Sequence, residues 1–228
     1  MARRQINRKA DEKHSLTESV LGSTVGRAFA FALWFLFALV VSIVIEWVGM
    51  LFWWDENHSR AMLQREVDYL SHLEINTLFK LHPVELATGA VETLNQGYAF
   101  LGADRWLPAL QSQIGWLYLA LSSAVDVTYT LVIRLATVVL ALPAFVFWGL
   151  LGLIDGLVER DIRKECGGIE SSFVYHHVKP LMMPAIAVSC GLYLTLPISF
   201  NPGLFFLIPQ GLFFITVYFT ASSFKKFL

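Results

Sequence analysis

Two adjacent histidines in a polar segment are the first residues to consider for chemistry in this sequence. His176 and His177 follow Cys166 and Glu170, and all three residue types can bind zinc. Adjacent residues on a helix point about 100° apart, so both imidazoles rarely face one ion, unlike the i,i+4 pair of zinc proteases. Cys166 and Glu170 could complete the set only if the chain folded back at Gly167-Gly168. We expect no metal site and no cofactor, and interpret the histidine pair as a contact with the membrane interface or a partner.

Motifs of the common enzyme classes are absent from the sequence. It has no P-loop, no glycine-rich dinucleotide fingerprint, no Gly-x-Ser-x-Gly and no His-Glu-x-x-His. Its two cysteines, Cys166 and Cys190, are too few for a disulfide framework or a cysteine-based zinc site. We therefore expect no catalytic residues and no enzymatic activity.

Two charged residues lie inside long apolar stretches. Glu46 is near the end of the first stretch, and Arg134 is several residues into the second. Ionisable residues in membrane segments are costly, so they usually pair or serve a function. We predict that Glu46 and Arg134 pair across two helices; separate extension of each side chain to the interface stays open as the alternative. A proton relay would need further acids or histidines at the centre of the spans, which the sequence lacks.

The elements that position these residues are membrane helices. Hydrophobic residues make up 56% of the 228 and charged residues only 15%, whereas soluble domains have about 25% charged residues. Four stretches are long and apolar enough to cross a bilayer. The sequence therefore predicts an all-α integral membrane protein with four transmembrane helices. The predicted spans are Ala28 to about Met50, Val127 to Ile154, Leu181 to Ser199 and Leu204 to Ala221.

The first stretch follows a basic segment, which raises the alternative of a cleaved signal peptide. Its apolar part is too long for one, and Trp53-Trp54-Asp55-Glu56 follows in place of a small-x-small cleavage pattern. We interpret it as an uncleaved signal anchor.

The distribution of lysine and arginine predicts the orientation, because these residues favour the cytoplasmic side. Six precede the first span, whereas the long segment from Asp55 to Gly115 has four against eight acidic residues. We expect both termini in the cytoplasm of a bacterium and the long segment in the periplasm. The basic residues on the predicted cytoplasmic side are Arg3, Arg4, Arg8, Lys9, Lys13, Arg27, Arg160, Arg163, Lys164, Lys179, Lys225 and Lys226.

The periplasmic segment is predicted to be a small helical cap. An amphipathic pattern with Leu63, Val67 and Leu70 predicts a helix over 58–81, with Leu78 as its last apolar residue. A second helix is predicted to begin at Pro83, a favoured first position. Its apolar stripe could pack on the sister helix, on the bilayer or on another protein, and we favour packing within the chain. The stripe consists of Val84, Ala87, Val91, Leu94 and Tyr98, and Gly102 and Pro108 are expected to break the chain before the next span.

Two connections are also predicted. Phe200-Asn201-Pro202-Gly203 suits a type II turn, which would make spans three and four an antiparallel hairpin. In the cytoplasmic connector, Leu151, Ile154, Val158 and Ile162 continue a helical stripe out of span two, and Gly167-Gly168 ends it. A short helix capped at Ser171 or Ser172 and running to Lys179 is expected to lie in the headgroup region.

The connector contains three distinctive runs: Gly152-Leu153-Ile154-Asp155-Gly156-Leu157-Val158-Glu159-Arg160-Asp161-Ile162-Arg163, Gly167-Gly168 and Glu170-Ser171-Ser172-Phe173-Val174-Tyr175-His176-His177. With these runs the chain resembles a family of membrane proteins encoded in integrating conjugative elements, whose domain has no assigned activity. The resemblance implies a Gram-negative inner membrane and a role in conjugative DNA transfer, beside the coupling ATPase that feeds a type IV secretion channel.

We hypothesise that the chain is a scaffold or accessory subunit that contacts the coupling ATPase through this connector. The alternative is a small transporter, channel or exclusion protein of the envelope, which could form a pore only as a homo-oligomer. The basic arm is expected to lie on anionic lipid and not to bind nucleic acid. The predicted contact residues are Asp155, Glu159, Arg160, Asp161, Arg163, Glu170, Ser171, Phe173, Tyr175, His176 and His177.

The predicted organisation has seven parts. They are a basic arm (1–27), helix 1 (28–54), the periplasmic helical segment (55–115), helix 2 with its lead-in (116–154), the cytoplasmic connector (155–180), a transmembrane hairpin (181–221) and a cytoplasmic tail (222–228).

Overall fold

The structure is a computed structural model that describes residue 26 and residues 29–72, 82–166 and 176–223. Within these ranges all regular structure is helical and no strand is present. Four helices are long and apolar enough to cross a membrane: Phe29–Phe52, Gly115–Glu165, His176–Thr195 and Pro202–Ser222. The prediction of an all-α membrane protein with four spanning helices is confirmed.

The chain forms two compact units, residues 1–41 and residues 42–228. The helix Phe29–Phe52 contributes to both. The packing and the site described below belong to the second unit.

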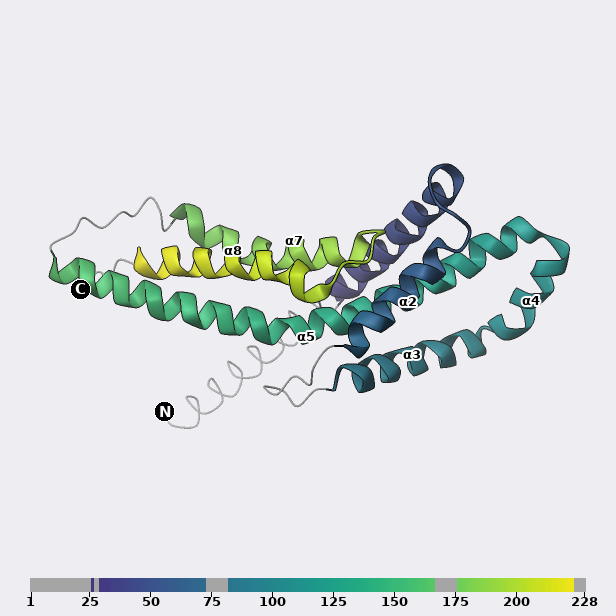
Figure 1. Ribbon diagram of the computed structural model, residues 1–228, viewed down its shortest axis with the longest axis horizontal. Coiled ribbons are helices and arrows are strands. Elements are labelled where there is room, and N and C mark those ends of the chain that lie inside the picture. Colours follow the sequence, from purple (N-terminus) through teal and green to yellow (C-terminus); the bar gives the residue numbers. More distant parts are fainter. Residues whose placement is uncertain (1–25, 27–28, 73–81, 167–175, 224–228) are drawn as a thin grey trace, which may run out of the picture. The chain divides into compact units, whose positions relative to one another are not determined.

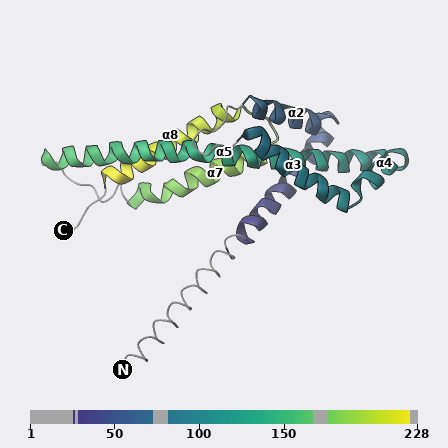
Figure 2. The same ribbon diagram turned by 90° about the horizontal axis from the view of Figure 1, so that it is seen from below.

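Helix α5 (Gly115–Glu165) is the longest element of the second unit. Its 51 residues extend for about 75 Å, more than twice the roughly 30 Å of a bilayer's hydrocarbon core. Helix α8 (Pro202–Ser222) runs beside the half of α5 nearer Glu165, and two further helices, α2 (His58–Ser71) and α3 (Pro83–Phe100), run beside the other half (Figures 1 and 2). The predicted span over 127–154 is therefore the middle of one continuous helix.

Small residues hold α5 against α8. A Cβ added at Gly152 would lie 2.6 Å from the carbonyl oxygen of Phe214, and one at Gly156 would lie 2.6 Å from that of Tyr218. Gly-x-x-x-Gly spacing of this kind lets membrane helices approach to backbone contact. Because the residue numbers of the contacting positions rise together along the two helices, α5 and α8 run parallel.

The connection into α8 differs from the expected type II turn. Asn201 is the N-cap, its side-chain oxygen accepts a hydrogen bond from the Gly203 amide at 3.0 Å, and Pro202 is the first helical residue. Gly203 is thus helical, and Gly102 is the only glycine with positive φ among the described residues. The turn prediction was wrong because Asn201 is a strong helix cap and proline fits the first helical position equally well. The antiparallel hairpin remains: α7 (Met182–Thr195) precedes α8 and packs against it.

The described residues of the segment predicted to be periplasmic form three helices. Pro83 begins α3 as predicted, and Gly102, at φ 70°, separates α3 from α4 (Ala103–Gln113). Pro108 lies inside α4 and does not break it. The described part of the first predicted helix ends at Ser71, and Leu78 lies outside the described residues.

The connector is helical on both of its described sides. Helix α5 ends at Glu165 with Cys166 as its C-cap, just before Gly167-Gly168, which lie outside the described residues. Helical structure is described again from His176 and passes through a 3₁₀ turn, Lys179–Leu181, directly into α7. The short helix predicted to run to Lys179 is therefore joined to the third span by a tightened turn at Pro180.

Candidate functional site

A buried arginine joins three parts of the second unit. Arg134 of α5 is 2% exposed, and its Nη2 and Nε lie 2.8 and 2.9 Å from Oε1 of Glu66 on α2. Its guanidinium also donates to the carbonyl oxygens of Leu196 and Ile198 in the α7–α8 connection. These carbonyls follow the end of α7, where backbone acceptors have no helical partner. Arg134 therefore fastens both α2 and the hairpin to α5.

The second carboxylate oxygen of Glu66 accepts a hydrogen bond from an aromatic residue. The hydroxyl of Tyr193 donates to Oε2 of Glu66 at 3.0 Å, and the Arg134 guanidinium lies 5.4 Å from the centre of the Tyr193 ring. Glu66 is 1% exposed and Tyr193 2%. A buried ion pair is tolerated only when its remaining hydrogen-bonding capacity is met. The three side chains meet this condition together.

Glu46 has a different partner from the one predicted. Both of its carboxylate oxygens lie 3.1 Å from Nδ1 of His58, and no ion pair joins Glu46 to Arg134 among the described residues. His58 stacks on Trp54 with ring centres 4.2 Å apart, and the Trp54 ring covers Gly49. The predicted Glu46–Arg134 pair is therefore replaced by two pairs, because α2 supplies a closer partner to each residue.

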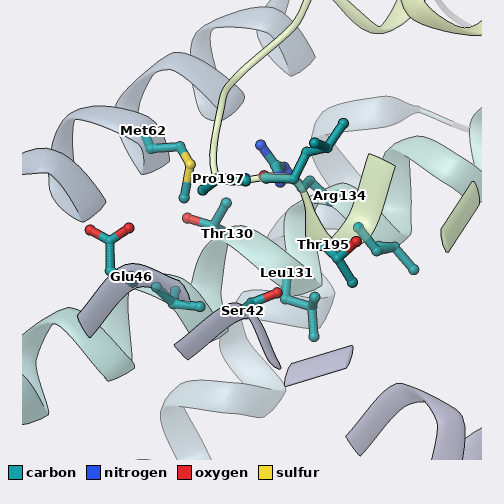
Figure 3. Close-up of a pocket in the computed structure, with 11 residues that line it drawn as sticks. Ser42, Glu46, Met62, Thr130, Leu131, Arg134, Thr195 and Pro197 are labelled. Carbon is teal, nitrogen blue, oxygen red and sulfur yellow. The ribbon is translucent and has the colours of Figure 1, made fainter. Parts of the chain in front are cut away.

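The two pairs border one small cavity. Glu46 and Arg134 both line it, with Thr130 between them in the view of Figure 3. Its volume is about 10 Å³, which holds roughly one water molecule. Glu46 and Arg134 therefore line the same cavity, but they do not contact each other directly.

Sequence reasoning missed Glu66 and Tyr193. The buried face of α2 consists of Ser59, Met62, Glu66 and Leu70, whereas Val67 of the predicted stripe is 48% exposed. The sequence did contain a signal for Glu66. It is spaced four residues from both Met62 and Leu70, which places an acid on the buried face of an amphipathic helix.

The predicted connector residues lie apart from this cluster. Asp155 and Asp161 are exposed, Arg160 contacts Asp161 at 3.1 Å, and Glu159 contacts Arg163 at 3.5 Å. Exposed apolar residues share the same helix end: Ile154 at 56%, Val158 and Ile162 at 53% each.

The rest of the predicted contact set is only partly described. His176 and His177 are exposed at the start of the helix that leads into α7. Glu170, Ser171, Phe173 and Tyr175 lie outside the described residues. The part of the chain that the structure describes contains no group of three or more metal-ligating side chains.

Comparison with known proteins identifies a family. The family model described as "IncC plasmid conjugative DNA transfer protein DtrJ-like" matches residues 52–225. The match includes the buried cluster of α2, α5 and α7 as well as the connector. No curated protein and no solved structure matches the chain. The chain belongs to the DtrJ-like family of conjugative DNA transfer proteins.

Proposed function

We propose that this protein is a non-enzymatic inner-membrane subunit of a conjugative DNA-transfer apparatus, and that it docks a cytoplasmic partner through the end of α5. The coupling ATPase that delivers DNA to a type IV secretion channel is the proposed partner. Family membership supports the role in conjugation. The docking role is supported by one observation, the exposed apolar and charged side chains at the C-terminal end of α5.

This surface combines apolar and charged side chains on a firmly held helix. Gly156 packs against Tyr218 and Ala221 near the end of α8, and α5 continues as a helix to Glu165. Val158 and Ile162 are four residues apart and therefore lie on one face, each 53% exposed. An apolar stripe bordered by charges is typical of a helix that binds a partner groove.

The charged residues beside the stripe form ion pairs with one another. Glu159 pairs with Arg163, and Asp161 contacts both Arg160 and Lys164, the latter at 3.7 Å. Exposed pairs of this kind contribute only about 0–1 kcal/mol to stability. They are better suited to setting the specificity and rate of association with a charged partner.

The orientation proposed with this function has both termini in the cytoplasm. It follows from the excess of lysine and arginine before the first span and in the connector. In this orientation the end of α5 faces the compartment of the ATPase, and α2, α3 and α4 face the periplasm.

Co-purification of the full chain with the coupling ATPase from membranes of donor cells tests the proposal. The double variant Val158→Ser/Ile162→Ser replaces two half-exposed apolar side chains of the stripe. A matched control, Leu204→Ser, changes a 70% exposed residue at the opposite end of α8. We expect the double variant to insert normally, but no longer to co-purify with the ATPase, and its donor cells to transfer DNA poorly. The control is expected to retain both ATPase binding and DNA transfer.

Two outcomes contradict the proposal. If the double variant retains the ATPase but transfer falls, the ATPase is not the partner at this surface. If transfer and co-purification are both unchanged, the end of α5 is not a docking surface.

A further inference from the structure

The cavity bordered by Glu46 and Arg134 has a buried hydroxyl group on its wall. The Ser42 side chain lines this cavity, and its oxygen is buried without a hydrogen-bond partner among the described residues. A buried polar atom that lacks a partner is costly, and an ordered water molecule commonly supplies the partner that the protein does not. A ligand in the cavity that hydrogen-bonds with Ser42 would remove this cost.

The volume and the charges of the cavity restrict what this ligand can be. At about 10 Å³, the cavity admits roughly one water molecule and nothing larger. Its lining includes one acidic side chain, Glu46, and one basic side chain, Arg134. A cation would lie beside the Arg134 guanidinium and an anion beside the Glu46 carboxylate, and like charges at such short distances repel each other. A neutral molecule that both donates and accepts hydrogen bonds fits these walls.

We propose that the cavity binds one water molecule, which links the two side-chain pairs that border it. The water accepts a hydrogen bond from the Ser42 hydroxyl and donates one to the Glu46 carboxylate. A carboxylate has about four acceptor positions, so the contact with Nδ1 of His58 leaves acceptor capacity on Glu46. Ser42 thereby gains the partner that the protein itself does not provide.

Two further lining residues have hydrogen-bonding capacity left for this water. The Thr130 hydroxyl donates to the Asp126 carbonyl oxygen at 2.9 Å, and its own oxygen can still accept a hydrogen bond. In the Arg134 guanidinium, Nε and Nη2 contact Glu66, and Nη1 and Nη2 donate to the α7–α8 connection. One of its five N–H groups, on Nη1, is left over from these contacts. The walls therefore offer two donors and two acceptors, the most that one water molecule can use.

This water fastens the end of one spanning helix to another. Ser42 and Glu46 belong to the helix Phe29–Phe52, whereas Thr130 and Arg134 belong to α5. A bridging water is enthalpically nearly as favourable as a direct hydrogen bond, so it joins the two helices at a point where their charged side chains do not meet directly. The water site does not depend on the docking role proposed for the other end of α5.

Hydroxyl-radical footprinting of the full chain in mild detergent tests the water site, because an X-ray pulse generates the radicals from bound water as well as from bulk water. Met62 is the reporter, since it lines the cavity, points toward Thr130 in the view of Figure 3 and has an oxidisable thioether. It is only 6% exposed, whereas Phe100 is 91% exposed and measures the radical dose from bulk solvent. We expect mass spectrometry to find Met62 oxidised and Phe206, which is 2% exposed and lies outside the cavity, unmodified.

Variants that fill the cavity separate its water from bulk solvent. Ser42→Val replaces the hydroxyl with methyl groups that occupy the position of the water, and Thr195→Ile fills the cavity from α7. Ser189→Val is the matched control, because Ser189 is buried outside the cavity and donates to the Ala185 carbonyl oxygen of its own helix at 2.7 Å. We expect oxidation of Met62 to be lost in both filled variants and retained in the control. Each filled variant tests the site by itself, so the test stands if one of them does not fold.

Three outcomes overturn the proposal. If Met62 stays unmodified in the protein without substitutions while Phe100 is oxidised, the cavity holds no water. If Met62 is oxidised equally with and without the filling substitutions, the radicals reach it from bulk solvent. If the Ser189→Val control also loses the oxidation of Met62, the loss does not report on the cavity.

Discussion

Arg134 and Glu66, separated by 68 residues in the chain, form an ion pair with an Nη2–Oε1 distance of 2.8 Å and with both side chains almost fully buried. The pair joins the longest span to a helix that lies outside the apolar stretches. Neither residue can be removed alone without leaving a buried charge that has lost its partner. The pair therefore makes the packing of α2 on α5 specific.

Removing one member of this pair is expected to destabilise the protein strongly. Glu66→Gln leaves the Arg134 guanidinium buried without a counter-charge, at a cost of about 3–5 kcal/mol. The double variant Glu66→Gln/Arg134→Met is expected to lose less stability than the two single variants lose in sum. Thermal unfolding in a mild detergent measures this coupling, and additive losses would show that the pair is not formed.

Glu46 is expected to couple to His58 more strongly than to Arg134. His58→Gln removes the imidazole that contacts a carboxylate that is 1% exposed, and residues in one network show coupling of about 0.5–3 kcal/mol. Double-variant cycles of Glu46→Gln with His58→Gln and with Arg134→Gln measure the two coupling energies, so that they can be compared. His72→Gln is the control, because His72 is exposed and contacts only Asp68 among the ion pairs of the described residues. A larger coupling between Glu46 and Arg134 would restore the direct pair predicted from the sequence.

The contact between α5 and α8 is expected to tolerate no side chain at Gly152. In Gly152→Ala the new Cβ meets the Phe214 carbonyl oxygen at 2.6 Å, and overpacking of this kind costs about 1–3 kcal/mol. Gly211→Ala is the matched control on α8, since nothing lies within 4 Å of its added Cβ. The control is expected to be neutral or slightly stabilising, because alanine favours the helix. Equal unfolding temperatures for the two variants would contradict the close approach.

Asn201 is expected to act as a helix cap. Asn201→Ala removes the acceptor for the Gly203 amide, and loss of an N-cap costs about 1 kcal/mol. Asn201→Asp keeps a capping oxygen and is expected to retain the original unfolding temperature. If alanine and aspartate are equally harmless, the cap does not stabilise the start of α8.

Composition and local pattern determined the membrane helices. The four apolar stretches are long enough to cross a bilayer without help from neighbours, because each satisfies its backbone hydrogen bonds internally. Pro83 could likewise be predicted as the start of a helix, since proline at the first helical position loses no hydrogen bond. At Asn201-Pro202-Gly203, by contrast, the same residues suit both a turn and a helix start, and local pattern did not distinguish the two.

The partners of the buried charges were decided by the tertiary structure. The sequence indicated that Glu46 and Arg134 needed partners, because each lies in an apolar stretch. It did not indicate that Arg134 would meet Glu66 and that Glu66 would meet Tyr193, 127 residues away. Those contacts depend on α2 packing along α5 with Glu66 on its inner face. Helix periodicity defines a buried face only approximately, and packing against the neighbouring helices determines which charge lies within hydrogen-bonding distance of which.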